Sequence, residues 1–420
     1  MILVKPSLFV GREYFFFGLT LLFIMIISLS FEYYHYSKLT QFDDAVVDVL
    51  VLKHYSKSQE GKVYDVLKLR SVDGALFYIT SDAPLKPLSG YTVKLWMKSK
   101  YLGFLDYIKG FVTRGRVISI SREKGETYKL GDDLLHLHKD VEVAEVYGAL
   151  FFALPMSSDL QQKFSMLGVS HLLAISGFHL GVLSFIVFTL LQWPYRYIQQ
   201  YFFPFRHRNR DLFFTVAIVL GLYLLFLGEV PSLLRAYVML IVGFFLHDRG
   251  FKIVSMQTLG VTIVLLLALW PRLFFSMGFW LSVSGVYYIF LYLYYFEKKS
   301  KYLAFVVIPL WVYLLMTPIS LLLFGNYSLY HPFSVFLTVL FTLFYPLALF
   351  LHLLGWGELM DGGLTYLLGL NIVGETWTFS SLWLLPYALL SLATLLHYKF
   401  LILLLAVAFG VSVTAIYQVT

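Results

Sequence analysis

The chain of 420 residues contains no cysteine. Disulfides, thiolate metal sites, iron–sulfur clusters and cysteine nucleophiles are therefore excluded. Charge is also scarce, because only 14% of the residues are Asp, Glu, Lys or Arg, against about 25% in soluble domains. No segment has the form G-x-x-x-x-G-K-[ST], so the phosphate-binding loop of nucleotide hydrolases is missing as well. Any work that the protein supports must therefore be driven by a partner or a gradient.

The few charges are unevenly divided along the chain. Residues 1–150 contain 19 of the 32 Lys and Arg and 17 of the 25 Asp and Glu, which leaves 13 and 8 for residues 151–420. With 59% hydrophobic residues overall, the second part is typical of an integral membrane domain. The apolar run at residues 15–29 is followed by aromatic residues, where a signal peptide needs a small-residue cleavage site. We therefore expect an uncleaved transmembrane anchor at residues 1–35.

A polar part with a different period follows the anchor. Apolar residues alternate in residues 47–51, 93–97 and 118–120, and Asp73-Gly74 and Ser89-Gly90 provide turns between such runs. Five or so short strands over about a hundred residues suit a small β-barrel of the oligonucleotide-binding (OB) type. The predicted fold class is a mixed membrane protein, with an extracytoplasmic OB-like domain at residues 40–147 and a polytopic α-helical transmembrane domain at residues 148–420.

The transmembrane domain is predicted to contain nine apolar segments. They lie near residues 168–193, 212–228, 232–247, 254–270, 273–296, 302–324, 331–354, 378–396 and 400–418. We expect interruptions at Ser176-Gly177, Pro231, Pro271, Ser284-Gly285, Pro318, Pro332 and Pro346. Broken helices at membrane depth must be buried in protein or line water, so they indicate a transport path.

Clusters of positive charge predict which ends of the segments are cytoplasmic. Such clusters occur at residues 196–210, 249–252 and 298–301, and Lys5 and Arg12 precede the first span. The N-terminus is then inside and the strand-rich domain outside the cytoplasmic (inner) membrane. Residues 331–377 remain ambiguous, since the amphipathic stretch around Glu358, Asp361 and Glu375 suits either an interfacial or a re-entrant segment.

Three apolar segments carry polar groups that are costly in a membrane. Residues 168–181 read GVSHLLAISGFHLG, residues 228–239 read GEVPSLLRAYVM, and residues 278–285 read GFWLSVSG. An arginine at a helix centre costs about 2.5 to 3.5 kcal/mol on translocon scales, so a water-lined or phosphate-facing position explains Arg235. The alternatives are snorkelling of Arg235 and close helix packing by the small residues. A serine–histidine hydrolase at Ser176 and His179 lacks a second catalytic motif.

Two further groups of residues are candidates in the N-terminal part. His136, His138 and Asp140 form H-x-H-x-D, but Val141 follows where a binuclear metal motif needs another histidine. We expect a solvated strand face there, with no metal ion and no cofactor. Basic grooves with aromatic side chains bind single-stranded nucleic acid. The groups available for this are Arg70, Tyr78, Lys94, Trp96, Arg114 and Arg116. An ordinary mixed-charge surface is the alternative.

The segments HLLAISGFHLG (171–181), PSLLRAYVM (231–239) and GFWLSVSG (278–285), in this order, resemble the membrane domain of the ComEC family of competence proteins. GFLDYIKGFVTRG (103–115) resembles a segment of that family's OB-like domain, with Leu105 as an added residue. The resemblance implies a channel that imports single-stranded DNA during natural transformation. The predicted pore residues are His171, Ser176, Gly177, His179, Ser232, Arg235, Trp280 and Ser282.

The resemblance also implies partners. These are a periplasmic or surface DNA receptor, and a cytoplasmic ATPase or single-strand-binding protein. The chain ends at Thr420 without the metallo-β-lactamase-like domain of many members, so we expect a short form that is not an enzyme. A separate nuclease would then degrade the excluded strand. The alternatives are a transporter of another polyanion or a polysaccharide with an extracytoplasmic binding module, and a membrane enzyme. The sequence shows neither inverted repeats nor a convergent catalytic set for these.

Overall fold

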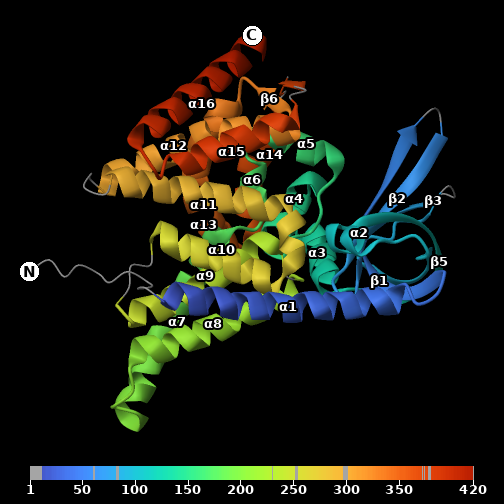
Figure 1. Cartoon of the computed structure of the whole chain (residues 1–420), viewed down its shortest axis with the longest axis horizontal. Coiled ribbons are helices and arrows are strands. Elements are labelled where there is room, and N and C mark those ends of the chain that lie inside the picture. The colour runs from blue at the N-terminus through green and yellow to red at the C-terminus, as the bar shows by residue number, and fades with distance from the viewer. Residues whose placement is uncertain are drawn as a thin grey trace, which may run out of the picture. The chain divides into compact units, whose positions relative to one another are not determined.

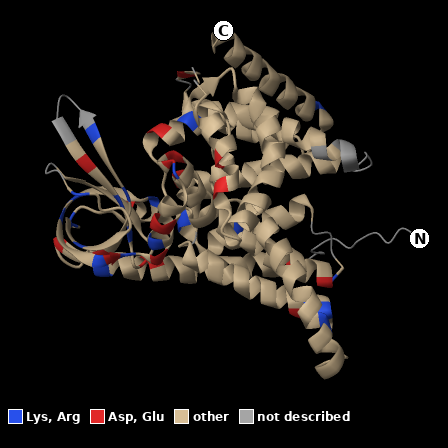
Figure 2. Ribbon diagram, turned by 180° about the vertical axis from the view of Figure 1, so that it is seen from behind, with Lys and Arg blue, Asp and Glu red and all other residues tan. Residues whose placement is uncertain are grey.

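A computed structural model describes residues 12–59, 62–81, 85–228, 230–250, 254–296, 301–370, 372, 374–376 and 380–419. The chain forms two compact units. The first comprises Met1–Leu134 and Gly260–Phe279, and the second comprises Leu135–Leu259 and Trp280–Thr420. Most of the charged residues lie on the strands and the short helices, and the long helices are nearly free of charge (Figure 2). This distribution agrees with the uneven charge of the sequence.

The strands of the first unit form a closed sheet (Figure 1). They are β1 (Asp44–Gln59), β2 (Lys62–Ser71), β3 (Leu76–Ser81), β4 (Tyr91–Lys98) and β5 (Phe111–Lys124). Their order is β1-β2-β3-β5-β4, and β1 also pairs with β4, which closes the ring. All pairs are antiparallel except β3 with β5. The strand prediction for this part is therefore confirmed, although the sheet itself ends at Lys124.

The interior of this sheet follows the alternating apolar pattern. Val93, Leu95 and Met97 of β4 are at most 1% exposed, whereas Lys94 between them faces outward. Helix α2 (Phe104–Lys109) buries Tyr107 and Ile108, and Gly110 then turns the chain into β5 with a φ of 91°. A glycine is needed at position 110 because a positive φ of this size is strained for other residues.

Helix α1 (Glu13–Leu39) also packs against this core, through Leu29, Tyr36 and Leu39.

The buried carboxylate of Asp65 links neighbouring segments of the sheet. Asp65 of β2 accepts hydrogen bonds from the backbone N–H of Leu85 and from the Ser56 hydroxyl, both at 2.7 Å. These bonds, the Leu85 bond above all, lower the pKa of the Asp65 carboxyl below its usual value. The His54 ring contributes further, with its Nε2 at 3.3 Å from the carboxylate. Asp65 is therefore ionised in the folded protein at neutral pH.

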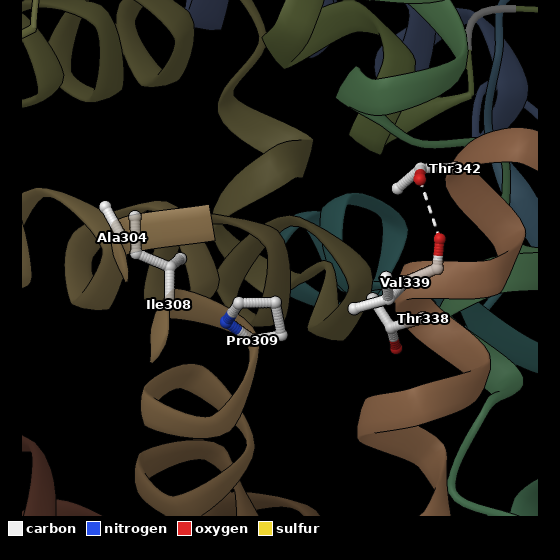
Figure 3. Close-up of a pocket in the computed structure, with 6 residues that line it drawn as sticks. All are labelled: Ala304, Ile308, Pro309, Thr338, Val339 and Thr342. Carbon is white, nitrogen blue, oxygen red and sulfur yellow. Dashed lines mark hydrogen bonds between the residues drawn. The ribbon is translucent and has the colours of Figure 1, made fainter. Parts of the chain in front are cut away.

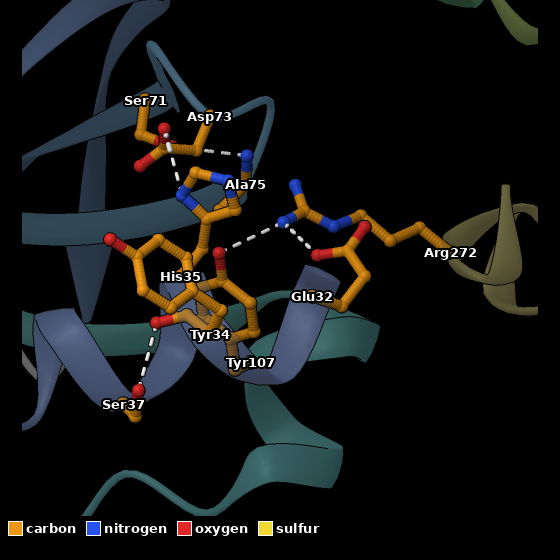
Figure 4. Close-up of polar contacts among 9 residues, drawn as sticks. All are labelled: Glu32, Tyr34, His35, Ser37, Ser71, Asp73, Ala75, Tyr107 and Arg272. Carbon is orange, nitrogen blue, oxygen red and sulfur yellow. Dashed lines mark hydrogen bonds and ion pairs between the residues drawn. The ribbon is translucent and has the colours of Figure 1, made fainter. Parts of the chain in front are cut away.

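An ion pair joins three parts of the first unit that are distant in the sequence (Figure 4). Arg272, in the short helix η1 (Pro271–Phe275), donates from Nη2 to the Glu32 carboxylate at 2.5 Å and to the Tyr107 hydroxyl at 2.9 Å. Both charged side chains are less than one-fifth exposed. Nearby, the His35 ring lies 3.1 Å from the Asp73 carboxylate. These contacts attach α1 and η1 to the sheet through α2 and the β2–β3 turn.

The second unit is helical. Its longer helices are α7 (Gly177–Phe202), α8 (Arg208–Phe226), α9 (Pro231–Asp248), α12 (Lys301–Phe324), α13 (Ser334–Leu353) and α16 (Tyr398–Val419), together with most of α11 (Met277–Phe296). Its shorter ones include α4 (Val141–Phe152), α5 (Ser158–Met166), α6 (Ser170–Leu173), η2 (His331–Phe333), η3 (Gly357–Met360), α14 (Asp361–Leu368), η4 (Ser381–Trp383) and α15 (Leu384–Ala393). The strands β6 (Asn326–Ser328) and β7 (Gly374–Thr376) pair antiparallel. Eight helices of the described chain, α1 among them, are long and apolar enough to cross a membrane.

The predicted apolar segments correspond to these helices, with two exceptions in length. The segments near 254–270 and 378–396 form only short apolar helices, Met256–Leu269 (α10) and Ser381–Ala393. The multi-pass character is nevertheless confirmed, because the hydrogen-bonded helical backbone is what a spanning segment requires.

Three of the predicted interruptions are wrong. Helix α11 continues through Ser284-Gly285, α12 through Pro318, and α13 through Pro346. A glycine inside a helix costs only about 1 kcal/mol relative to alanine, and neighbouring groups compensate for the lost bond of a proline in membrane helices. The other four positions do lie at helix starts or in short 3₁₀ helices: Gly177 begins α7, Pro231 begins α9, Pro271 begins η1 and Pro332 lies in η2.

The predicted strand around H-x-H-x-D is wrong as well. Helix α3 (Glu126–Leu137) includes His136, and the Asp140 side chain caps α4 by accepting a hydrogen bond from Glu142 N at 2.9 Å. His136 is exposed, but His138 is 6% exposed and lies inside the second unit. The alternation of polar residues is thus a helix end followed by a helix cap, since aspartate accepts well from the free N–H groups of a first turn.

Candidate functional site

The helix break at Ser176-Gly177 is the centre of the candidate site. Helix α6 ends at Leu173, the chain is extended at Ser176 with φ −125° and ψ 176°, and α7 begins at Gly177. Ser176 and His179 form a capping box, in which each side chain bonds to the backbone N–H of the other. The Nδ1 atom of His179 lies 3.1 Å from Ser176 N and 3.0 Å from Ser176 Oγ. Together these bonds fix the imidazole against the first turn of α7.

The capping box determines where the proton of His179 resides. A backbone N–H only donates, so Nδ1 must present its lone pair to Ser176 N, and the hydrogen of the neutral ring is on Nε2. His179 is fully buried, and its Nε2 atom has no hydrogen-bond partner in the described structure. The ring centroid lies 4.3 Å from that of Tyr345 on α13. The site therefore contains a buried, unused hydrogen-bond donor.

The same geometry explains the Ser176–His179 contact without hydrolytic chemistry. In a serine–histidine hydrolase the second ring nitrogen is oriented by a third group, usually a carboxylate. Nε2 of His179 has no such partner in the part of the chain that is described. The contact is a helix cap.

Helix α9 brings a buried arginine to this break. The Ser232 hydroxyl donates to the carbonyl of Ile175 at 2.5 Å, which attaches the start of α9 to the broken segment. Arg235, one turn further on, is only 4% exposed. A Cβ atom added to Gly177 would lie 3.3 Å from Ala236 Cβ and 3.7 Å from Arg235 Nη2. The absence of a side chain at Gly177 thus allows α7 and α9 to approach closely.

The partners of Arg235 are neutral. Nε donates to the Ser282 hydroxyl on α11 at 2.9 Å, and Nη1 lies 3.0 Å from the Met239 sulfur one turn along α9. No ion pair of Arg235 with a carboxylate occurs among the described residues. The segments 171–181, 231–239 and 278–285, which are far apart in the sequence, therefore meet around one buried cation.

Two further predicted pore residues lie on α6 and α11. His171 is exposed on α6, and its Nε2 lies 3.4 Å from the Thr338 hydroxyl on α13. Trp280 is 39% exposed and precedes Ser282 by two positions on α11. Thr338 also lines an apolar cavity of about 190 Å³, whose other lining residues are Ala304, Ile308, Pro309, Val339 and Thr342 (Figure 3). His171 therefore lies next to α13.

Four of the six predicted DNA-binding residues share one region of the sheet. Lys94 and Trp96 lie on β4, and Arg114 and Arg116 lie on β5, with Trp96 directly opposite Arg116. Lys94, Arg114 and Arg116 are exposed, and Trp96 is partly exposed. These side chains therefore lie on the outer face of the sheet. They form the basic–aromatic face of β4 and β5.

The other two lie on neighbouring strands. Tyr78 of β3 is opposite Val112 of β5 and is flanked by the buried Phe77 and Ile79, so it faces outward too. The Lys68 ammonium lies 5.9 Å from its ring centroid. Arg70 of β2 is partly exposed, opposite Leu76 of β3 and Leu50 of β1.

Sequence reasoning missed several residues of the membrane unit. Met239 has a local signal, since it follows Arg235 by four positions and so shares its helix face. Tyr345, which packs on His179, has none, because 166 positions separate the two. His352 and Asp361, which contact His138, are equally remote from it in the chain.

Comparison with known protein families identifies a match over the membrane part of the chain. A sequence model of the family described as "Competence protein" matches residues 154–417, which is more than half of the chain. No curated protein matches the chain, and no solved structure does. The matched range contains the helix break at Ser176-Gly177, the buried Arg235 and its Ser282 partner. The chain therefore belongs to the competence protein family.

Proposed function

We propose that this chain is a channel that conducts single-stranded DNA across the cytoplasmic membrane. Membership of the competence family and the eight membrane-length helices of the described residues indicate a multi-pass membrane protein with a role in DNA uptake during transformation. The channel and its single-stranded substrate go beyond this family role. DNA carries one negative charge per nucleotide, so its path must hold water and offer hydrogen-bond donors.

The buried Arg235 is the observation that carries this proposal. Removing an ion from water costs several kcal/mol even after relaxation, and a hydroxyl and a thioether offset little of it. An anion that contacts the guanidinium during transport would compensate for that cost. The planar fork of arginine pairs well with phosphate oxygens, so a backbone phosphate is the anion that we propose.

The other polar groups at the break extend the proposed path. Besides Arg235, the proposed path is lined by His171, Ser176, Gly177, His179, Ser232, Trp280 and Ser282. The buried Nε2–H of His179 is a further hydrogen-bond donor with no partner among the described residues. A path of this kind favours weak and repeated contacts, because DNA must leave each position as readily as it arrives. Gly177 contributes space, since a side chain there would press on α9.

The closed sheet is proposed to be an OB-like domain that receives the strand outside the membrane. Five strands in a small barrel suit that type, and the basic–aromatic face of β4 and β5 offers cations beside Trp96. Tyr78 and Arg70 would extend this face. The proposed division is an anchor at residues 1–35, this domain at 40–147 and the channel at 148–420, with the N-terminus in the cytoplasm.

The proposed partners are those that the family resemblance implies, and the lack of a phosphate-binding loop in the sequence supports an external source of energy. A receptor outside would deliver DNA, a cytoplasmic ATPase or single-strand-binding protein would draw it inward, and a separate nuclease would degrade the other strand.

Deletion of the gene, followed by three separate measurements, tests the channel. DNA bound to the cell, DNA protected from external nuclease outside the cytoplasmic membrane, and DNA in the cytosol are each quantified with a labelled fragment. Loss of the cytosolic DNA alone is expected. Loss of the first step as well would contradict a channel and favour a receptor.

A further inference from the structure

A buried histidine pair lies outside the proposed DNA path. His138, between α3 and α4, has a fully buried side chain, and its Nε2 faces Nε2 of His352 at 3.1 Å. Nδ1 of His138 lies 3.0 and 2.9 Å from the two carboxylate oxygens of Asp361. Nδ1 of His352 lies 2.7 Å from the carbonyl of Ala348. Both rings are thus fixed at both nitrogens.

The hydrogens of this network can be counted. The Ala348 carbonyl only accepts, so Nδ1 of His352 carries a hydrogen. An ionised Asp361 also only accepts, so Nδ1 of His138 carries one too. Two neutral rings would then direct lone pairs at each other across 3.1 Å. A hydrogen bond at this distance needs one more proton than two neutral imidazoles and one carboxylate possess.

We infer that His138 and His352 form a binding site for one proton, which they share between their Nε2 atoms with the Asp361 carboxylate as counter-charge. The network is then neutral overall, with every ring nitrogen in a hydrogen bond. The count is unchanged if the proton resides on Asp361, since His138 then donates to His352 instead.

The surrounding helices favour this charge arrangement. His352 lies in the last turn of α13, where the helix dipole favours a cation, and Asp361 begins α14, where it favours an anion. A Cβ atom at Gly357 would lie 2.8 Å from the His352 ring, so η3 closes over the ring.

The remaining ionisable groups nearby do not supply the proton. The Tyr147 ring of α4 stacks on His138 at 4.7 Å, and its hydroxyl is buried with no hydrogen-bond partner among the described residues. Burial, together with the nearby Asp361 charge, raises the pKa of Tyr147, so this hydroxyl stays protonated. Lys139 and Glu358 are exposed, and the Asp140 carboxylate caps α4.

A proton suits the site better than a metal ion. Two nitrogens face each other, whereas a transition metal takes about four ligands. Within the described ranges no group of three or more His, Cys, Asp or Glu side chains is placed to hold a metal. Loss of the proton would leave two lone pairs opposed and weaken the attachment of the α3–α4 link to α13 and α14.

The test is the thermal unfolding midpoint of the full-length protein in detergent micelles between pH 5.5 and pH 8.5. On this proposal the shared proton stabilises the fold, so the stabilisation is present at low pH and is lost as pH rises and the proton leaves. The unfolding constant of the wild type should rise by up to about tenfold per pH unit within that window. The unfolding constant of His352→Gln should depend less on pH. A glutamine amide can rotate to present either its N–H or its C=O to Nε2 of His138, so it needs no extra proton.

Further variants and measurements make the outcome decisive. His136→Gln, at an exposed position, is the matched control and should keep the wild-type pH profile. Asp361→Asn removes the counter-charge, so the loss of stability with rising pH should begin at a lower pH. Identical profiles for the wild type and His352→Gln would overturn the proposal. So would one zinc ion per chain by elemental analysis. If His352→Gln fails to fold, nitrogen NMR of histidine-labelled wild type must show the Nε2–H···Nε2 coupling at pH 6, and its absence overturns the proposal equally.

Discussion

Replacing Arg235 by methionine separates a transport role from a structural one. Methionine is unbranched and fills a similar space, but it is apolar. The change removes the bond to Ser282, and hydrogen bonds to charged groups contribute about 1.5 to 3 kcal/mol. It also removes the desolvation cost of a cation that is 4% exposed, which is several kcal/mol. Membrane abundance and the thermal unfolding midpoint should therefore stay level or rise.

DNA import should change in the opposite direction. If the guanidinium contacts a phosphate during transport, the variant loses one charge-assisted hydrogen bond of about 1.5 to 3 kcal/mol from the transport step. Each 1.4 kcal/mol is about a factor of ten, so import should slow by about 10-fold to 150-fold. Arg235→Lys keeps the charge but loses the planar fork, and intermediate import is expected.

The assay is the transfer of a labelled fragment to the cytosol, with DNA bound outside and membrane abundance measured in the same cells. Loss of import in proportion to abundance would mean that Arg235 is structural. Wild-type import by Arg235→Met would refute the phosphate contact. If alanine variants of His171, Ser176, His179 and Arg235 all accumulate and import normally, the proposed pore lining is wrong.

Three other predictions concern the first unit and the topology. Full-length protein should bind single-stranded oligonucleotides with an affinity that falls steeply with salt. Arg116→Ala should reduce the log–log slope by about 0.7, whereas Lys100→Ala, which removes an ammonium already paired with the Asp43 carboxylate at 2.7 Å, should leave it unchanged. Because the chain has no cysteine, single cysteines at the exposed positions Ser119 and Asn209 can be labelled directly, and an impermeant reagent should reach only the former from outside. Asp65→Asn should lower the unfolding midpoint more at pH 7 than at pH 3, because the stabilisation from a lowered carboxyl pKa is complete above the unfolded value of about 3.9 and is lost as pH falls through the lower folded value; an equal effect at both pH values would contradict this.

Local patterns in the sequence were sufficient for elements whose burial has a fixed period. The buried Val93, Leu95 and Met97 alternate with outward residues, and that alternation predicts β4 directly. The break at Ser176-Gly177 was predictable because serine and glycine are both favoured at helix starts and disfavoured inside helices.

Other features depend on partners that no local pattern reveals. In the sequence, His138 looks like an exposed strand residue. In the fold it follows a helix end and is buried against Asp361, which is 223 positions away. The interruption expected at Ser284-Gly285 is absent because a helix in lipid keeps its backbone bonds whatever its propensity. Arg235 was recognisable as costly, but that its partner is Ser282 follows only from the packing of α9 against α11.

The ion pair between Glu32 and Arg272 has a consequence for biosynthesis. The strands β1 to β5 are contiguous in the chain and complete once residue 124 has been made. The partner of Glu32, however, is Arg272, which is synthesised 240 positions later. At about 5 to 20 residues per second, that interval lasts about 12 to 48 seconds on the ribosome. During this time the carboxylate on α1 lacks its arginine, so the bond that attaches α1 to η1 forms only after η1 has been made.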